Sequence, residues 1–259
     1  MNRRVLRWIF IGLILSYSSF TQAQSTSSTQ FSNELRFSRA LAKRWTGELT
    51  FTNGWMQSPP AAGLFSRYSQ WSLGGWGHNY IAPKWRLSAG FFYYRKIEQE
   101  EPEQLKSNEF RLSGQTNYYI KKIGYAITGR SRLEWRYIEN SEGNYNSVFR
   151  LREQLKMIVS INGKSIRQGI FYGFGSEELA FKTPSDVNGN EFFDRNRFEI
   201  GAGYAVTNDM SIELYYTNEF LPRETNQINH IINLDFNFKN LISNIRKRIS
   251  PPENSVPDD

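Results

Sequence analysis

The feature that most constrains this chain is the alternation of apolar and charged residues along several of its segments. Residues 125–137 show it best, because side chains point in turn to opposite faces of a strand. One face would carry Tyr125, Ile127, Leu133, Trp135 and Tyr137, and the other Arg130, Arg132, Glu134 and Arg136. A helix would scatter the same charges around its circumference. The segment therefore predicts a strand of about a dozen residues, which suits a tilted membrane strand.

The same two-residue period returns along most of the chain. It is found in residues 85–93, 109–120, 149–159, 197–204, 210–216 and 228–238, and residues 31–38 and 45–55 are further candidates. The connections are of two kinds: residues 81–84, 121–124 and 206–209 are short, whereas residues 57–66, 98–104, 140–146 and 182–191 are long and mostly polar. Short periplasmic turns and long outer loops are typical of a bacterial outer-membrane β-barrel.

Aromatic residues, which make up 15% of the chain, gather at both ends of these predicted strands. Those beside short turns are Tyr80, Trp85, Tyr119, Tyr125 and Tyr204, and those beside long loops are Trp55, Tyr94, Tyr137, Phe193 and Phe220. Two interfacial girdles explain this distribution. A soluble antiparallel sandwich or a lipocalin-like barrel would also alternate, but it would need neither girdles nor loops that are long on one side only.

The predicted fold is an all-β, antiparallel up-and-down transmembrane β-barrel of about 10–12 strands. The candidates number about eleven, yet single-chain bacterial barrels use even numbers of strands. We therefore expect ten or twelve strands. Either the first segment lies outside the wall, or one strand has been merged or missed.

The first residues have the pattern of an export signal. A basic start with Arg3, Arg4 and Arg7 precedes a short apolar run, residues 8–15, and a polar end at Ala23. This predicts a secretory signal peptide over residues 1–23, since the apolar run is too short to cross a bilayer as a helix. We expect a flexible N-terminus over residues 24–30, the barrel over 31–240 and a periplasmic tail over 241–259. The expected location is the cell outer membrane of a Gram-negative bacterium.

Composition excludes several kinds of site. The chain has no cysteine, which rules out a disulfide or a thiolate metal site. Three of its seven net positive charges lie in the leader, which leaves about +4, too modest and dispersed to predict binding to nucleic acid. We expect no metal and no cofactor.

Several of these segments resemble a known family of outer-membrane barrels. They are residues 130–136, which include Arg130, Arg132, Glu134 and Arg136, then residues 149–152, 194–204 and 210–216. They resemble the family catalogued as domain of unknown function 2490, over about residues 31–238. The resemblance implies an outer-membrane barrel in contact with outer-membrane lipids and the barrel-assembly machinery, but no activity or oligomeric state. One departure is Asn233, which stands where the last strand of such barrels commonly has glycine.

The charged faces predict a cluster of side chains inside the barrel. Its members are Arg130, Arg132, Glu134, Arg136, Arg150, Arg152, Arg197 and Glu199. In a narrow barrel such side chains fill the interior and must form ion pairs or meet water. One interpretation is a basic constriction that favours anions. We favour the other, an ion-pair network that fills the lumen of a structural or envelope barrel, because a small barrel has little room for a channel.

The alternative function is a lipid- or lipopolysaccharide-modifying enzyme. Such an enzyme needs a nucleophile such as serine and a histidine base. The chain has two histidines, His78 and His230, and His78 follows Ser69 and Ser72, so that a serine–histidine pair there is conceivable. Two histidines also arise by chance, and we therefore assign no catalytic residue.

One loop resembles the start of a calcium-binding loop. Residues 186–191, Asp-Val-Asn-Gly-Asn-Glu, are rich in oxygen ligands but lack the distal glutamate at the usual spacing. We expect an ordinary turn there, since Asn, Asp and Gly favour turns.

Overall fold

Every alternating segment forms a β-strand. The computed structural model describes residues 25–59, 62–97 and 107–240. The predicted signal peptide, residues 1–23, and the predicted tail, residues 241–259, lie outside this range. The eleven strands are β1 (Ser25–Ala42), β2 (Trp45–Met56), β3 (Arg67–Ala82), β4 (Trp85–Lys96), β5 (Ser107–Lys122), β6 (Tyr125–Glu139), β7 (Tyr145–Ser160), β8 (Phe171–Lys182), β9 (Phe193–Ala205), β10 (Met210–Leu221) and β11 (Asn226–Lys239).

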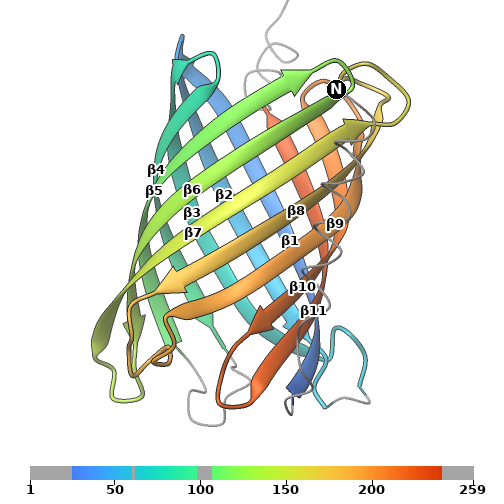
Figure 1. Ribbon diagram of the computed structural model, residues 1–259. Coiled ribbons are helices and arrows are strands. Elements are labelled where there is room, and N and C mark those ends of the chain that lie inside the picture. The colour runs from blue at the N-terminus through green and yellow to red at the C-terminus, as the bar shows by residue number, and fades with distance from the viewer. Residues whose placement is uncertain (1–24, 60–61, 98–106, 241–259) are drawn as a thin grey trace, which may run out of the picture.

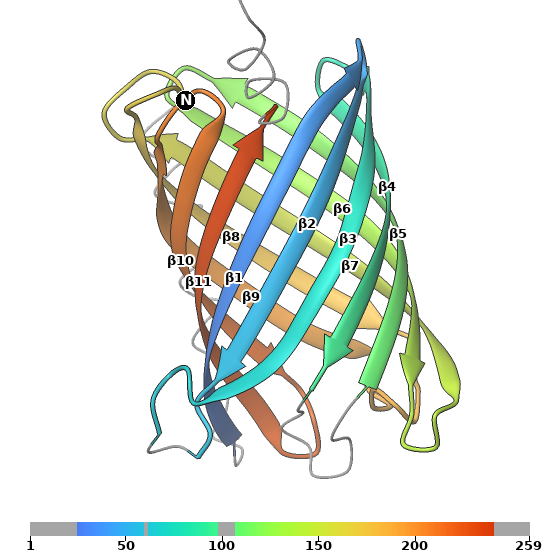
Figure 2. The ribbon, with the colours of Figure 1, turned by 180° about the vertical axis from the view of Figure 1, so that it is seen from behind.

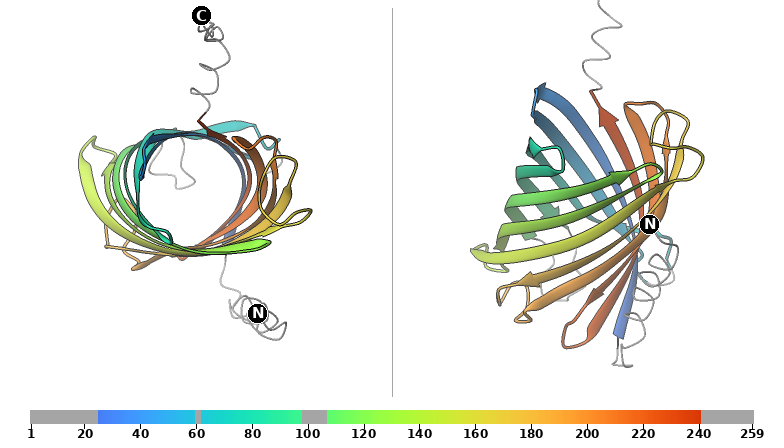
Figure 3. Two further views of the ribbon diagram at one scale, coloured as in Figure 1. Left: turned by 90° about the horizontal axis from the view of Figure 1, so that it is seen from above. Right: turned by 45° about the horizontal axis from the view of Figure 1, so that its top comes forward.

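The strands close into a single barrel, as the alternation predicts (Figure 1). Each strand pairs with its neighbours in the sequence in antiparallel fashion, and the view along the axis shows one ring (Figure 3). The eleven strands fall within the expected 10–12, but the even number that single-chain bacterial barrels use is not met. The wall has eleven, because β1 belongs to it and closes the barrel by pairing with β11 in parallel (Figure 2). An odd number of alternating strands must bring its first and last strands together in the same direction.

The parallel seam is continuous along β1. Residues 25–30, expected to be flexible, pair with residues 226–231 and so form part of the wall. Further along, the rings of Phe37 and Phe238 stack with centroids 5.1 Å apart. Arg36 Nη1 donates a hydrogen bond to Asn237 Oδ1 at 3.0 Å. Both backbone pairing and side-chain contacts therefore hold this joint.

The two rims of the barrel differ. Residues 43–44, 83–84, 123–124 and 206–209 make short connections at one end, here called the short-turn rim, where residues 161–170 form the one longer connection. Gly124 has φ +84° in its turn, a conformation that favours glycine. The other end, the long-loop rim, carries residues 57–66, 97–106, 140–144, 183–192 and 222–225.

The wall is apolar outside and polar inside. Leu73, Leu112, Leu133, Leu155 and Leu214 point away from the axis, and each is more than half exposed. On the inner side of the wall, Glu109, Glu134 and Asp194 are fully buried. Among the described residues, no helix is long and apolar enough to cross a membrane.

Aromatic side chains form a collar near each rim on the outside of the barrel. Near the short-turn rim, Trp85 contacts Tyr118 and Phe171 contacts Tyr204, with ring centroids 4.8 and 4.4 Å apart. Near the long-loop rim the pairs include Phe31–Phe65, Tyr93–Phe110 and Trp135–Tyr137. Two residues predicted for the girdles point inward instead. Tyr94 accepts a hydrogen bond from Arg111, and Tyr119 lies under the guanidinium of Arg86.

Candidate functional site

The inside of the barrel carries a dense set of ion pairs on the strands from β5 to β10. We call this set the lumen network, and it comprises eight arginines and five carboxylates. Its members are Glu109 and Arg111 of β5, Arg130, Arg132, Glu134 and Arg136 of β6, Arg150 and Arg152 of β7, Glu178 of β8, Asp194, Arg195 and Arg197 of β9, and Glu219 of β10. Most of them lie in the half of the lumen nearer the long-loop rim.

Glu134 is the central acceptor of the network. Its Oε2 accepts from Arg150 Nη2 at 2.6 Å, and its Oε1 accepts from Arg152 Nη1 at 3.0 Å. Arg111 and Arg132 approach the same carboxylate at 3.7 and 3.6 Å. The side chain has no solvent exposure. A buried carboxylate of this kind is stabilised only while its arginine partners remain in place.

The other four carboxylates are also shared between arginines. Glu109 accepts from Arg111 at 2.6 Å and from Arg136 at 2.7 Å. The remaining contacts run from Arg130 and Arg152 to Glu178, from Arg150, Arg195 and Arg223 to Asp194, and from Arg195 and Arg197 to Glu219. These links join six neighbouring strands across the interior. The network therefore fills this half of the lumen with paired charge.

Seven of the eight residues predicted for the interior belong to this network. The eighth, Glu199, also points inward, but it accepts a hydrogen bond from Ser176 Oγ at 2.6 Å. The prediction omitted six members: Glu109, Arg111, Glu178, Asp194, Arg195 and Glu219. Glu109, Arg111 and Glu178 occupy inward positions of their strands, so the two-residue period could have found them.

A loop packs beside the network at the long-loop rim. Val187, from the connection between β8 and β9, packs against Ile138 and Val148 in a buried apolar cluster. Glu191 of the same loop lies 3.7 Å from Lys182, at the end of β8, and 3.6 Å from Arg223 of the 222–225 connection. The loop is therefore tied to the inner wall at this rim. Among the described residues, no group of His, Cys, Asp and Glu is arranged to hold a metal ion.

The half of the lumen nearer the short-turn rim is richer in acid and wetter. Its inward carboxylates are Glu34, Glu48, Glu213 and Asp235. Arg36 pairs with Glu34 and lies 3.6 Å from Glu48. The Arg36 side chain is 38% exposed. Solvent therefore reaches this half of the interior, in contrast to the lumen network.

The two histidines lie on opposite faces of the wall. His230 points outward, where its Nδ1 lies 2.6 Å from Tyr216 Oη. His78 points inward and is buried. Its partner is neither Ser69 nor Ser72, as the sequence suggested, but Ser88 of β4, whose Oγ lies 2.8 Å from His78 Nδ1. Ser72 lies six residues away on the same strand, a separation of about 20 Å, whereas Ser88 is the cross-strand neighbour of His78.

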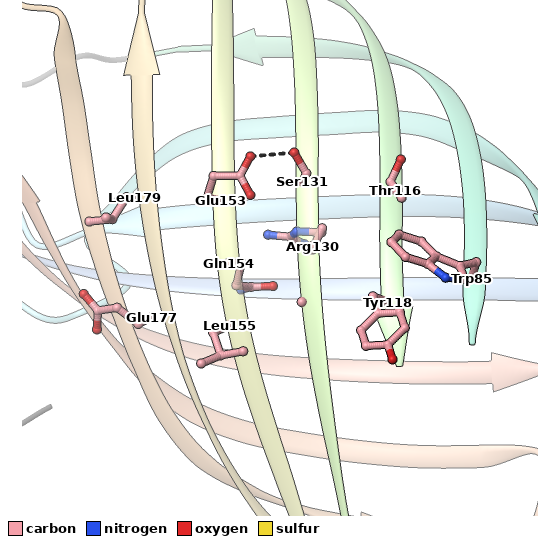
Figure 4. Close-up of a pocket in the computed structure, with 11 residues that line it drawn as sticks. Trp85, Thr116, Tyr118, Arg130, Ser131, Glu153, Gln154, Leu155, Glu177 and Leu179 are labelled. Atoms are coloured by element: carbon pink, nitrogen blue, oxygen red, sulfur yellow. Dashed lines mark hydrogen bonds between the residues drawn. The ribbon is translucent and has the colours of Figure 1, made fainter. Parts of the chain in front are cut away.

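The outer wall also has a groove that contains carboxylates (Figure 4). It has a volume of about 500 Å³ and runs from Trp85 on β4 to Leu179 on β8, over Gly129. Glu153, which accepts a hydrogen bond from Ser131, and Glu177, which accepts one from Asn196, interrupt the apolar surface here.

Comparison with known protein families gives a match over most of the chain. The family described as "Protein of unknown function (DUF2490)" matches residues 20–230. No curated protein matches the chain.

Proposed function

We propose that this chain, which belongs to the DUF2490 family of proteins of unknown function, spans the outer membrane of a Gram-negative bacterium as a barrel with a closed lumen. It would act as a structural component of the envelope rather than as an open channel. Its long-loop rim would face outward, since outer-membrane barrels carry their long loops on that side.

The polarity of the wall is the observation that carries this proposal. A soluble barrel buries its apolar side chains inside and exposes polar ones to water. Here the leucines of the wall face outward while Glu109, Glu134 and their arginine partners face inward. Exposed to water, so continuous an apolar surface would promote aggregation, whereas lipid would cover it. The aromatic collars near the two rims support the same reading.

The burial of the lumen network supports a closed lumen. A conducting pore needs water along its whole length, and its charged rings stay hydrated. Glu109, Glu134 and Asp194 have no exposure, and each is paired with at least two arginines. Ions would therefore have to break several buried pairs to pass.

Fractionation and gel migration test the membrane assignment. We expect the protein in the outer-membrane fraction, soluble only with detergent, and we expect an unheated sample to migrate differently from a boiled one. Recovery of a folded protein from the periplasm without detergent would refute the proposal.

Planar-bilayer recording tests the closed lumen. The folded protein should give no regular conductance steps, because the lumen network blocks the path. Anion-selective steps would instead support the basic constriction that the arginines allow.

A further inference from the structure

We propose that Ser88, His78 and Glu48 form an acyl-hydrolysing site on the inner wall, in the half of the lumen nearer the short-turn rim. The three residues come from the adjacent strands β4, β3 and β2. The substrate class is a carboxylic ester with a short acyl chain. This site borders the lumen network but shares none of its three residues with it, and it goes beyond the structural role proposed above.

The geometry is that of a nucleophile, a base and an orienting acid. Ser88 Oγ lies 2.8 Å from His78 Nδ1. On the other side of the ring, His78 Nε2 lies 3.6 Å from Glu48 Oε2, and the described residues offer that nitrogen no closer hydrogen-bond partner. The carboxylate therefore favours the tautomer with a proton on Nε2. That tautomer leaves Nδ1 free to accept the serine proton.

The reaction at this site needs only these groups, the ester and water. Ser88 Oγ would attack the ester carbonyl carbon as its proton passes to His78 Nδ1. Collapse of the tetrahedral intermediate breaks the bond to the leaving alcohol, which takes the proton from His78. Water then attacks the acyl-serine, gives one proton to His78 and releases the carboxylic acid as that proton returns to Ser88. Glu48 touches no reacting atom and acts as a positioning residue.

A cation stands beside the nucleophile. Arg86 lies two residues before Ser88 on the inner face of β4, about 7 Å along the strand. Its Nη2 donates to Asn117 at 3.3 Å, but its buried Nε has no hydrogen-bond partner among the described residues. The backbone N–H groups of a barrel wall are committed to strand pairing. A side-chain donor such as this guanidinium is therefore the group that could stabilise a developing oxyanion.

Two aromatic rings provide an apolar surface next to the pair. Trp76 stacks on His78 with an interplanar angle of 16°, and Phe92 meets Trp76 edge-on with centroids 5.2 Å apart. Each ring lies against a glycine of the wall: a Cβ on Gly90 would come within 2.5 Å of Trp76, and one on Gly74 within 2.1 Å of Phe92. Both rings are buried, and the Arg132 guanidinium lies over Trp76, 4.8 Å from the ring centroid. The room beside the pair therefore admits only a short acyl chain.

Solvent reaches the same level of the lumen. Arg36, which lies 3.6 Å from Glu48, is 38% exposed. Ser88 and Glu48 lie close to the starts of β4 and β2, and both strands begin at the short-turn rim. A small ester would therefore enter from that rim, without crossing the lumen network.

The test is covalent labelling of the full-length, folded barrel in detergent. A fluorophosphonate probe should form an adduct on Ser88, located by peptide mass spectrometry, and p-nitrophenyl butyrate should be hydrolysed. Ser88→Ala should abolish the adduct, and both Ser88→Ala and His78→Gln should slow hydrolysis about 100-fold or more. Ser113→Ala is the matched control, since Ser113 is a buried, inward serine of β5 whose hydroxyl makes no hydrogen bond to a histidine among the described residues. The Ser113→Ala variant should form the Ser88 adduct and hydrolyse the ester at the wild-type rate.

Glu48 is tested as a positioning residue. Glu48→Gln should slow labelling of Ser88, and Glu48→Asp should restore part of the rate. If Glu48 had a purely structural role, the two variants would label Ser88 at the same rate. Heat-modifiable migration verifies the fold of every variant. The inference is overturned if the folded wild type forms no adduct on Ser88, or if Ser88→Ala hydrolyses the ester as fast as Ser113→Ala. Neither result would affect the membrane assignment.

Discussion

Leu133 and Glu134 are neighbours in the chain, yet they occupy opposite environments. Leu133 is 56% exposed on the outer wall, whereas Glu134 is completely buried among four arginines. The same contrast holds along β5, β6 and β7, where a one-residue step exchanges an apolar surface for a charged interior. The two faces of one strand therefore need different surroundings. Under the proposed membrane assignment lipid covers the outer face, whereas the inner face of these strands provides its own counter-charges.

Removing the central carboxylate should have the largest effect on stability. Glu134→Ala would leave Arg150 and Arg152 buried without their shared acceptor, which costs about 3–5 kcal/mol. Urea unfolding of the barrel in lipid vesicles measures the loss. A change below about 1 kcal/mol would mean that water enters the lumen network.

Placing a charge on the outer wall should have the second-largest effect on stability. Leu133→Arg should cost about 2–4 kcal/mol if the wall faces the middle of a bilayer, and the cost should fall to about 0–1 kcal/mol near an interface. Leu41→Arg, at the short-turn rim, is the matched control. Equal and small losses for both variants, measured by the same unfolding assay, would argue against lipid on this face.

Removing a carboxylate from the wetter half of the lumen should reduce stability less. Glu34 pairs with Arg36, and both side chains are partly exposed. Glu34→Ala should therefore cost about 1 kcal/mol or less. A loss as large as that of Glu134→Ala would erase the difference between the two halves of the interior.

The smallest effect, opposite in sign, is expected for Glu153, which faces outward in the groove of Figure 4. Glu153→Leu removes a carboxylate from an apolar surface and should stabilise the barrel by about 1 kcal/mol, because lipid solvates charge poorly. If the variant were destabilised instead, the hydrogen bond from Ser131 would outweigh that solvation cost.

Much of this arrangement could be predicted from local pattern. The two-residue period placed Arg130, Arg132 and Glu134 on one face, because the direction of side chains along a strand depends on position alone. It also gave the all-β class and the two kinds of connection. The misplaced Tyr94 and Tyr119 were assigned by closeness to a turn rather than by this period.

What could not be predicted depends on pairing between strands. The match of His78 with Ser88 is set by the register of β3 and β4, which shifts between Asn79 and Ala82. Asp194 joins the lumen network next to an irregularity in the pairing of β8 and β9. Local pattern also cannot show that β1 closes the wall, since its Ser/Thr-rich start shows little alternation and pairs with residues at the far end of the chain.

The parallel seam has a consequence for topology and assembly. Because β1 and β11 run in the same direction, Ser25 and Asn240 stand at opposite rims, so reporter groups attached at these two points would sit on opposite sides of any membrane the barrel crosses. An even-stranded barrel would bring both to one side. The seam also joins the most distant positions in the wall, such as Ser28 and Asn229, which are 201 residues apart. Hairpins close short loops and form readily, whereas this joint needs the whole sheet to curl first. Sealing the seam is therefore expected to be the final step of folding.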